Sequence, residues 1–566
     1  MTFKYFGGYF MNKNKSVIGF VGLILVGFIS ALDLTIVAVT MPKIQQYFKT
    51  SLDDIMWITL MFSLVSTSFL ITMAKLGDIF GRKKIVIFSL IVFVISSAIC
   101  GFSKYLWVII LGRGLQGLGS AGISTVAIAI ALNMFPKEKS NITAGVWAAF
   151  QAIAIAIGPS LGGYISEYLN WRYIFFINVP IGILSLVLIY RFIDETYDEA
   201  SSKKIDFVGI VLITVCLSTF TYMLTKVNTL GYYSMTTILL TIISIVSLTL
   251  FIIIEKKSDF PLVDFSLFKI RSFTSSTVVL GLYGVSTILS FNLINFYFNS
   301  IFNYTTLESG NILFFFAIGI MLSAIVAAIL TFRFKVSTIV IFSVIINIIG
   351  IFLLSTTTPS TSKNVFIAYL FIAGIGVGGP TAQLFANALK DVPSEKIGLA
   401  SGLSNVIPKA FSLIITAILI CVLTSNLGNA FDKTKVDLIN KFSSTDTIDN
   451  SSKEYIISRL KIMSKENYLQ VENEIENKLK SSIATNLKNL PLDNQKEIIE
   501  KQKEMFTFLD RTIKESNTSL KSNGAKAYTD TFKFGITFLI LTLILSFLIN
   551  PKNSISTSKK DLQPES

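Results

Sequence analysis

Long apolar segments, separated by short polar connections, recur along almost the whole chain. Fourteen of them are long enough to cross a bilayer, with approximate limits 16–41, 55–74, 85–103, 106–133, 142–163, 173–193, 205–225, 235–255, 273–298, 308–331, 337–356, 365–388, 398–424 and 532–549. A helical crossing needs about 20 predominantly apolar residues. The pattern therefore predicts an all-α polytopic membrane protein.

Composition and charge agree with that prediction. Only 15% of the 566 residues are charged, against about 25% in soluble domains. The net charge of +14 does not indicate nucleic acid, because cytoplasmic loops of membrane proteins collect Lys and Arg. The short connections after the even-numbered spans hold most of these cations. We therefore expect both termini in the cytoplasm, the lipid bilayer as a partner, and no nucleic acid.

The chain offers little metal or redox chemistry. It has no histidine, and Cys100, Cys216 and Cys421 lie in separate apolar segments without CxxC spacing. Neither a disulfide framework nor a metal site is indicated, and any proton chemistry must involve carboxylates. P-loop and zinc-protease signatures are also absent. The sequence predicts a protein that is not an enzyme and uses no cofactor.

One acidic residue interrupts the first apolar segment. Asp33 is the only acid in GFVGLILVGFISALDLTIVAVTMP, residues 19–42, where a carboxylate costs about 2.5–3.5 kcal/mol on insertion scales. Either Asp33 carries a proton, or it only forms hydrogen bonds with a neighbouring helix.

Span 4 contains an intramembrane cation within a glycine-rich stretch. Residues 111–122 read LGRGLQGLGSAG, so Arg113 and Gln116 lie among small residues that allow close helix contact. Arg113 needs a partner, for which Asp33 or a backbone carbonyl would serve. The alternative is an arginine that extends outward to the membrane surface.

Two further motifs predict local structure, a tight turn and a bent helix. The connection AKLGDIFGRKK, residues 74–84, forms a tight turn with a charge cluster that could hold the cytoplasmic side shut; its candidate residues are Gly77, Asp78, Gly81, Arg82 and Lys83. The alternative is simple anchoring by positive charge. In AIAIAIGPSLGGYI, residues 152–165, a proline bends the helix and glycines admit a neighbour; the candidates are Gly158, Pro159, Gly162 and Gly163.

A long polar stretch separates the last two spans. Residues 426–530 are rich in Lys, Glu, Asn and Ser, and segments 452–482 and 494–516 show helical spacing of apolar residues. We expect amphipathic helices outside the membrane, which could pair as a hairpin. A charged, solvated excursion without a specific role is the alternative.

These motifs resemble those of a known family. Residues 74–84 closely resemble the signature GxLxDxxGRxxx of the major facilitator superfamily, with Ala74 in place of the first glycine. Span 4 is similar to the family's helix-4 motif, whose arginine the resemblance links to proton transfer. Span 5 resembles the antiporter motif that exporters of this family carry.

Other stretches resemble one subgroup, the 14-span drug:proton antiporters. They are LDLTIVAVTMP (32–42), WRYIFFINVPIG (171–182) and PLVDFSLFKIRSF (261–273). The resemblance implies two six-helix bundles plus two extra spanning helices. The expected parts are 1–193, 194–271, 272–425, the extracytoplasmic helical loop 426–530, and 531–566. The loop lies outside the resemblance, and Pro408–Lys409 stands where relatives show Arg-Gln.

The resemblance implies a proton-coupled exporter of hydrophobic or amphiphilic small molecules, including drugs, in a bacterial plasma membrane. It assigns proton coupling to Asp33 and Arg113, and we expect a monomer. A flippase for lipid or envelope precursors and a non-transporting sensor or scaffold are the alternatives. Candidate substrate-cavity residues, for which helix packing is the competing interpretation, are Gln116, Trp147, Gln151, Asn292, Asn295 and Lys409.

Overall fold

The computed structural model describes residues 13–135, 140–197, 206–258, 261–331, 333–393, 396–445, 450–462 and 495–549. Within these residues the chain is helical and contains no strand. Fourteen helices are long and apolar enough to cross a membrane. The prediction of an all-α protein with 14 spans is therefore confirmed.

The first half of the bundle, here called the N-half, contains six spanning helices. Its elements are α1 (Lys13–Phe48), α2 (Leu52–Ile55), α3 (Trp57–Phe80), α4 (Arg82–Phe102), α5 (Leu106–Gly122) with its continuation η1 (Ile123–Ala127) and α6 (Ile128–Asn133), α7 (Ser140–Tyr168), α8 (Tyr173–Phe176) and α9 (Asn178–Phe192). Buried side chains such as Leu23, Phe93 and Ile189 form one apolar core between them. This core fixes the positions of the polar groups that the N-half encloses.

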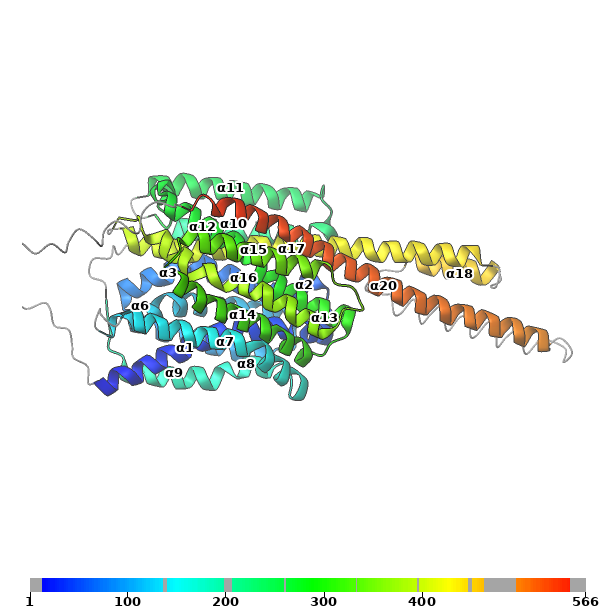
Figure 1. Ribbon diagram of the computed structural model, residues 1–566, viewed down its shortest axis with the longest axis horizontal. Helices are drawn as coiled ribbons and strands as arrows, with labels where there is room; N and C mark the ends of the chain where they lie inside the picture. The colour runs from blue at the N-terminus through cyan, green and yellow to red at the C-terminus, as the bar shows by residue number, and fades with distance from the viewer. Residues whose placement is uncertain are drawn as a thin grey trace, which may run out of the picture. The chain divides into compact units, whose positions relative to one another are not determined.

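Two further helices and the second half, the C-half, follow. The extra pair is α10 (Phe207–Leu230) and α11 (Met235–Lys257); the C-half contains η3 (Phe265–Lys269), α12 (Arg271–Thr287), η4 (Ile288–Leu293), α13 (Ile294–Phe302), α14 (Thr306–Leu330), α15 (Val336–Ser355), α16 (Lys363–Leu389), and parts of α17 (Ile397–Ser444) and α20 (Gln495–Ser546). In Figure 1 the spanning helices run side by side. The α10–α11 pair exposes most of its apolar surface, as a lipid-facing pair would.

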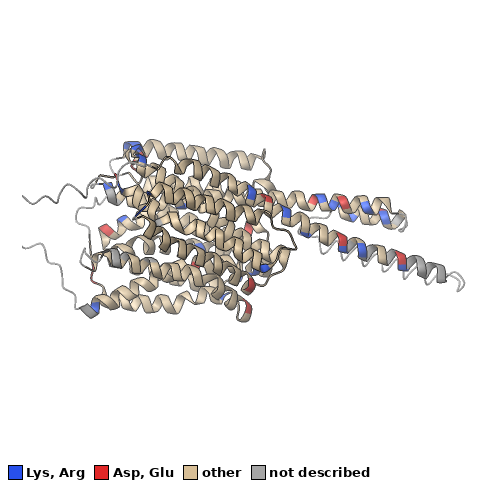
Figure 2. Cartoon of the chain, in the orientation of Figure 1, with Lys and Arg blue, Asp and Glu red and all other residues tan. Residues whose placement is uncertain are grey.

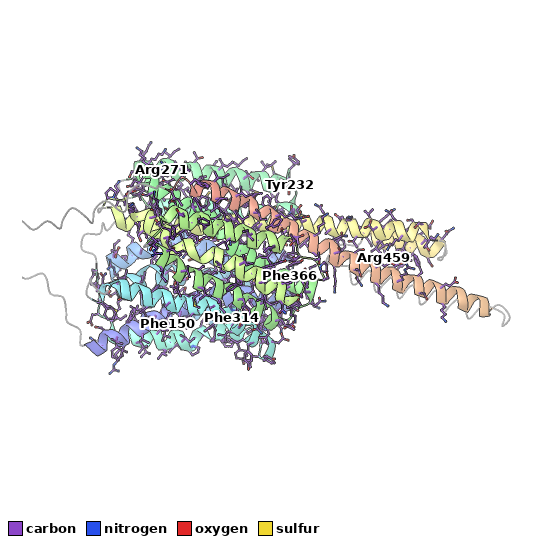
Figure 3. The ribbon with its side chains drawn as sticks, viewed as in Figure 1. Phe150, Tyr232, Arg271, Phe314, Phe366 and Arg459 are labelled. Atoms are coloured by element: carbon purple, nitrogen blue, oxygen red, sulfur yellow. The ribbon has the colours of Figure 1, made fainter. Side chains whose placement is uncertain are left out.

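Charged side chains avoid the middle of the bundle. Figure 2 shows the spanning helices mostly without charge, with Lys, Arg, Asp and Glu near their ends. Arg271 and Tyr232 mark opposite ends of the bundle in Figure 3. We call the end with Arg82 and Arg271 the basic end and the end with Tyr232 the opposite end.

The structure contains two compact units. The first is the bundle, and the second contains residues 356–361 and 422–531. In the second unit α18 (Asn450–Lys461) and the segments of α17 and α20 that belong to it share an apolar core, which includes Phe431, Phe442 and Ile456. An ion pair of 2.5 Å between Lys441 and Glu515 ties α17 to α20. This unit therefore has its own packing.

Several helices continue beyond the predicted spans, and α17, predicted to end near 424, continues to Ser444. Helix α1 continues to Phe48, because Pro42 removes a single backbone donor without ending the helix. The last span is predicted to begin near 532, and the bundle includes α20 from Phe532 onward, but the helix itself begins at Gln495 and is continuous to Ser546. The helix predicted at 494–516 is confirmed from residue 495 onward, but as part of α20. Of the helix predicted at 452–482, α18 confirms the part up to Lys461; residues 463–482 lie outside the described residues.

Candidate functional site

The Asp33 carboxylate lies inside the N-half, where it meets side chains from two other helices. Arg113 of α5 pairs with its Oδ2 through Nη1. Asn178 of α9 donates from Nδ2 to Oδ1 across 3.0 Å, and Gln116 Nε2 lies 3.4 Å from the same oxygen. Asp33 is 0% and Arg113 1% exposed. The structure thus brings together the two residues predicted for proton coupling.

The guanidinium of Arg113 has three further contacts. Its Nε donates to the backbone oxygen of Ile58 across 3.2 Å, and its Nη1 donates to Gln116 Oε1 across 2.8 Å. The ring of Phe62 lies 4.3 Å from the guanidinium carbon. Removing two charges from water costs several kcal/mol per ion, so a buried pair needs such additional bonds. Arg113 therefore does not extend to the membrane surface but is fixed in the N-half.

Close helix contact makes these bonds possible. Gly117 of α5 lies against the backbone carbonyl of Phe62 in α3, where any Cβ would overlap with the oxygen. Because small residues let two helix backbones approach, Arg113, one turn earlier, reaches the carbonyl of Ile58. The glycine-rich pattern of span 4 thus positions the cation.

A second layer of polar groups surrounds the pair. Ser97 of α4 accepts from Gln116 Nε2 across 2.6 Å and from Asn178 Nδ2 across 3.5 Å. Sequence reasoning noted Asn178 only as part of a resemblance and did not consider Ser97. The signal in the sequence was an amide side chain, Asn178, in an otherwise apolar helix. Such a side chain needs a hydrogen-bond partner when it is buried. The network joins α1, α4, α5 and α9.

The predicted motif of span 5 is packed against the helix that carries Asp33. Gly158 of α7 lies directly against the Thr35 side chain, and a Cβ at Gly162 would be 2.9 Å from the backbone oxygen of Ile36. Helices α7 and α1 therefore approach at residues that follow Asp33 closely in the chain.

The same motif also joins the two halves. A Cβ at Gly163 would be 2.6 Å from the Leu307 Cα of α14, and Gly310 lies against the backbone oxygen of Pro159. Nearby, Asn295 of α13 donates from Nδ2 to the backbone oxygens of Ala38 and Val39, at 2.8 and 2.7 Å. We call these α7–α14 and α1–α13 contacts, on the side of the opposite end, the outer joint.

At the basic end the halves meet through other helices. Val406 of α17 packs against a cluster that contains Leu70 and Met73 of α3. Ile71 of α3 packs against the cluster that contains Leu403 of α17. These α3–α17 contacts are called the inner joint here. The structure therefore has contacts between halves on both sides of the Asp33 network.

The charge cluster at 74–84 is bonded within the N-half. Arg82 Nη2 lies 2.7 Å from Asp78 Oδ1, and Glu195 Oε1 accepts from the backbone N–H of Lys83 across 2.8 Å. A carboxylate at the first N–H groups of α4 is favourable because these groups have no partner within the helix. Gly81 has φ = 110°, a conformation that glycine favours.

The structure places Asp78 against Arg82 of its own loop and not against the other half. Gly77 lies against Val126 of η1, and Lys83 Nζ donates to the backbone oxygen of Tyr190 across 2.8 Å. Sequence reasoning also missed Glu195, which holds the turn from a point far along the chain. The cluster therefore ties α3, α4 and α9 to one another at the basic end.

A family profile described as Major Facilitator Superfamily matches residues 23–416. The chain belongs to the major facilitator superfamily. Multidrug resistance protein 3 of Bacillus subtilis is 30% identical over 420 residues, which cover 73% of this chain and 81% of that protein. Multidrug export protein EmrB of Escherichia coli K12 is 29% identical over 394 residues, which cover 69% and 76%.

Solved structures show the same fold. An inward-facing, occupied bacterial homolog of the human lysosomal transporter Spinster has a TM-score of 0.58 and 13% identity, and the match covers 94% of this chain and 96% of that one. Together with the family match, this supports the major facilitator architecture expected for a chain of 14 spans. A member of this transporter superfamily is a transporter and not an enzyme.

The predicted cavity residues have different surroundings in this superfamily member. The Trp147 ring packs against Gly27 of α1 and is 7% exposed. Gln151 is half-buried, and the buried Oδ1 of Asn292 has no partner among the described residues. Asn295 belongs to the outer joint. Trp147 and Asn295 thus follow the packing interpretation.

Lys409 of α17 is half-buried, and within the described part of the chain it forms no ion pair or hydrogen bond. It lies three residues after Val406, which packs on α3, and three before Ser412, which contacts α12 at Gly284. Lys409 therefore lies at a position of α17 between the two halves.

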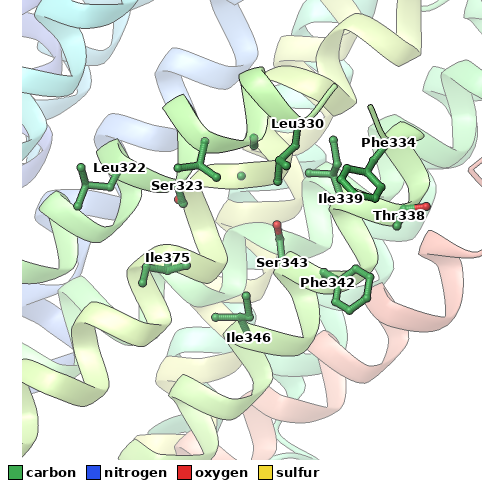
Figure 4. Close-up of a pocket in the computed structure, with 13 residues that line it drawn as sticks. Leu322, Ser323, Leu330, Phe334, Thr338, Ile339, Phe342, Ser343, Ile346 and Ile375 are labelled. Atoms are coloured by element: carbon green, nitrogen blue, oxygen red, sulfur yellow. The ribbon is translucent and has the colours of Figure 1, made fainter. Parts of the chain in front are cut away.

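A cavity of about 380 Å³ lies elsewhere, within the C-half. Figure 4 shows it between α14, α15 and α16, with apolar side chains such as Leu322, Phe334 and Ile375 around it. Several of these side chains are exposed on the apolar surface of the bundle. None of the predicted substrate residues lines this cavity.

Proposed function

We propose that this transporter exports hydrophobic or amphiphilic small molecules, drugs among them, in exchange for protons. The observation that carries the proposal is the buried Asp33–Arg113 pair, the ion pair at the centre of the N-half. A buried ion pair is weak evidence for stability but a suitable switch, because one proton removes one of its charges. The multidrug names of the relatives support the substrate class.

Protonation of Asp33 would change the bonds of several helices. The neutral carboxyl loses its charge partner, while Arg113 keeps its bonds to Ile58 and Gln116. An uncompensated buried cation is costly, so α5 and α1 would shift relative to each other. This shift would favour a different arrangement of the two halves.

Proton access requires more than one state. Asp33 is 0% exposed in this structure, so a proton reaches it only when the halves separate at one end. The outer joint and the inner joint lie on either side of Asp33, and opening them in turn gives alternating access. Proton uptake from outside and release inside would then drive one outward step of the substrate.

We further propose that the basic end faces the cytoplasm of a bacterium and contains both termini. The excess of Lys and Arg in the short connections at that end supports this orientation. The substrate would enter from the basic end or the inner leaflet and leave at the opposite end.

The distribution of charge favours neutral or monovalent amphiphilic substrates over dications. Between residues 271 and 389 the only acid is Glu308, and this carboxylate forms an ion pair with Lys363. Lys409, at a position of α17 between the halves, adds an unpaired positive charge. A dication would therefore meet repulsion from Lys409 and no unpaired carboxylate between residues 271 and 389.

Proton-driven efflux from proteoliposomes tests the proposal. Wild-type protein in liposomes with an imposed pH gradient should move ethidium against its concentration gradient, and an internal pH dye should report the coupled proton flux. Asp33→Asn should abolish both signals. Asp432→Asn, which removes an exposed carboxylate of α17 outside the bundle, is the matched control and should leave them unchanged. Full proton-driven transport by Asp33→Asn would reject the assignment.

A further inference from the structure

Two carboxylates outside the Asp33 network face each other at the basic end of the α10–α11 pair. Asp206 caps the N-terminus of α10, where its Oδ1 accepts from the Gly209 N–H across 2.8 Å. Glu255 lies near the end of α11 and is 2% exposed, and its Oε2 accepts from the Val263 N–H across 3.2 Å. Each carboxylate thus uses one oxygen to hold nearby backbone.

The other two oxygens have no donor. Asp206 Oδ2 and Glu255 Oε1 are buried, and no hydrogen-bond donor reaches either one within the described part of the chain. Both lie beside Gly209, where a Cβ would be 2.8 Å from Asp206 Oδ2 and 2.5 Å from Glu255 Oε1. The two orphaned oxygens are therefore close neighbours that face the same point.

The charges of the two carboxylates indicate that they share a proton. Two buried carboxylates that share a site cannot both be ionised without strong repulsion, so one of them retains a proton. A proton on either oxygen also supplies the donor that both oxygens lack, because a protonated carboxyl has one O–H. A single shared proton thus satisfies the charge and the hydrogen bonding together.

The surrounding charges match a pair with a single negative charge. Lys75 of α3 is the cation that interacts electrostatically with Asp206. Of the other charged groups nearby, Asp264 pairs with Lys396 and Lys256 lies over the Phe265 ring. Lys257, in the last turn of α11, is a further cation at this end. The interaction of Lys75 is with Asp206, so it favours one ionised carboxylate in the pair, which is the charge that a single shared proton leaves.

We propose that Asp206 and Glu255 hold one proton between them and form a second proton-binding site, separate from Asp33. The site lies where α10, α11, α3 and the segment after α11 meet, beside an apolar cluster that contains Phe251 and Leu262 and packs against Phe69 of α3. Loss of the proton would push α10 and α11 apart at this end. Titration of the pair therefore controls how firmly the extra helices are held on α3.

Infrared spectroscopy of the full chain in nanodiscs tests this site without any transport measurement. The carbonyl stretch of protonated carboxyl groups is recorded while the pH is raised from acidic to alkaline. Wild type should keep a protonated carboxyl above the pH at which ordinary carboxyls titrate. Asp206→Asn and Glu255→Gln should each lose this signal, and each should release one proton fewer than wild type.

Asp33→Asn separates this site from the Asp33 network, because it should keep the signal. Asp206→Asn is suited to the test, since asparagine caps a helix as well as aspartate. Gly209→Ala removes no titratable group but places a methyl group against both orphaned oxygens. It should push the two carboxylates apart, so that their repulsion weakens and the signal moves to lower pH. Gly145→Ala, with nothing within 4 Å, should not change the signal. An unchanged signal in both Asp206→Asn and Glu255→Gln, or its loss in Asp33→Asn alone, would overturn the proposal.

Discussion

Arg113 of α5 and Asp33 of α1 form an ion pair from which solvent is excluded, and both side chains are bonded to further groups of the N-half. A buried pair of this kind costs desolvation energy that its partners only partly return. The ion pair is therefore weak evidence for stability by itself.

Removing one member of the pair should cost much more than removing both. Arg113→Leu leaves the Asp33 carboxylate buried without its partner, and we expect a loss of about 3–5 kcal/mol. The double variant Asp33→Asn, Arg113→Leu has no buried charge at this site and should recover most of that loss. Thermal unfolding of the single and double variants in detergent measures the coupling. Additive losses would show that the two side chains do not stabilise each other.

The outer joint should be intolerant of a single methyl group. Gly163→Ala places a Cβ 2.6 Å from the backbone of Leu307, and a backbone atom cannot move aside alone. We therefore expect α7 and α14 to separate and transport to fall at least tenfold. Gly145→Ala on the same helix meets nothing within 4 Å and should transport normally, as efflux assays on both variants would show. Equal activity of the two variants would argue against close packing at the joint.

The ion pair between Asp264 and Lys396 predicts a pH dependence at the basic end. Burial raises the pKa of Asp264, but the hydrogen bond from Lys396 and those within the turn outweigh it, so the pKa is lower than usual. A lowered pKa gives stability that is complete above the unfolded value, about 3.9, and lost as the pH falls through the folded value. Asp264→Asn should cost up to about 1 kcal/mol at pH 7.

At pH 3 the difference between Asp264→Asn and wild type should become smaller, because part of the wild-type carboxylate is then protonated. Unfolding midpoints at the two pH values check the sign. A difference that grows on acidification would contradict the ion-pair explanation.

Deleting the second unit separates two functions. Residues 430–525 belong to a unit with its own apolar core, so a short linker in their place should leave the bundle folded. If the chain exports drugs, ethidium efflux should survive the deletion. If it instead hands lipid to an external acceptor, ethidium transport would be absent in both proteins and only a lipid phenotype would depend on the unit.

Much of the fold could be predicted from the length of the apolar segments. Each of the 14 helices has a run long enough to span, and that property is local. The meeting of Asp33 and Arg113 was also predictable, because two opposite charges in apolar spans each need a partner. The continuation of α20 could not be predicted in this way. Its composition changes from polar to apolar along the helix, but its backbone stays helical throughout.

The remaining partners depend on geometry that a single sequence does not contain. Asn178 reaches Asp33 from 145 residues away, and Glu195 reaches Lys83 from 112 residues away. Many polar residues in the chain could have served, and helix register decided which ones did. The same applies to Asn295, a candidate for either a cavity or helix packing, whose amide bonds two carbonyls of α1.

The polar network around Asp33 has a consequence for how a hydrogen ion could act. The Asp33 carboxylate is bonded to α5 and α9, and both of its amide donors also bond Ser97 of α4. Gain or loss of a proton at Asp33 would therefore change hydrogen bonds of α1, α4, α5 and α9 together. The N-half would respond as a single body, without any relay from one helix to the next.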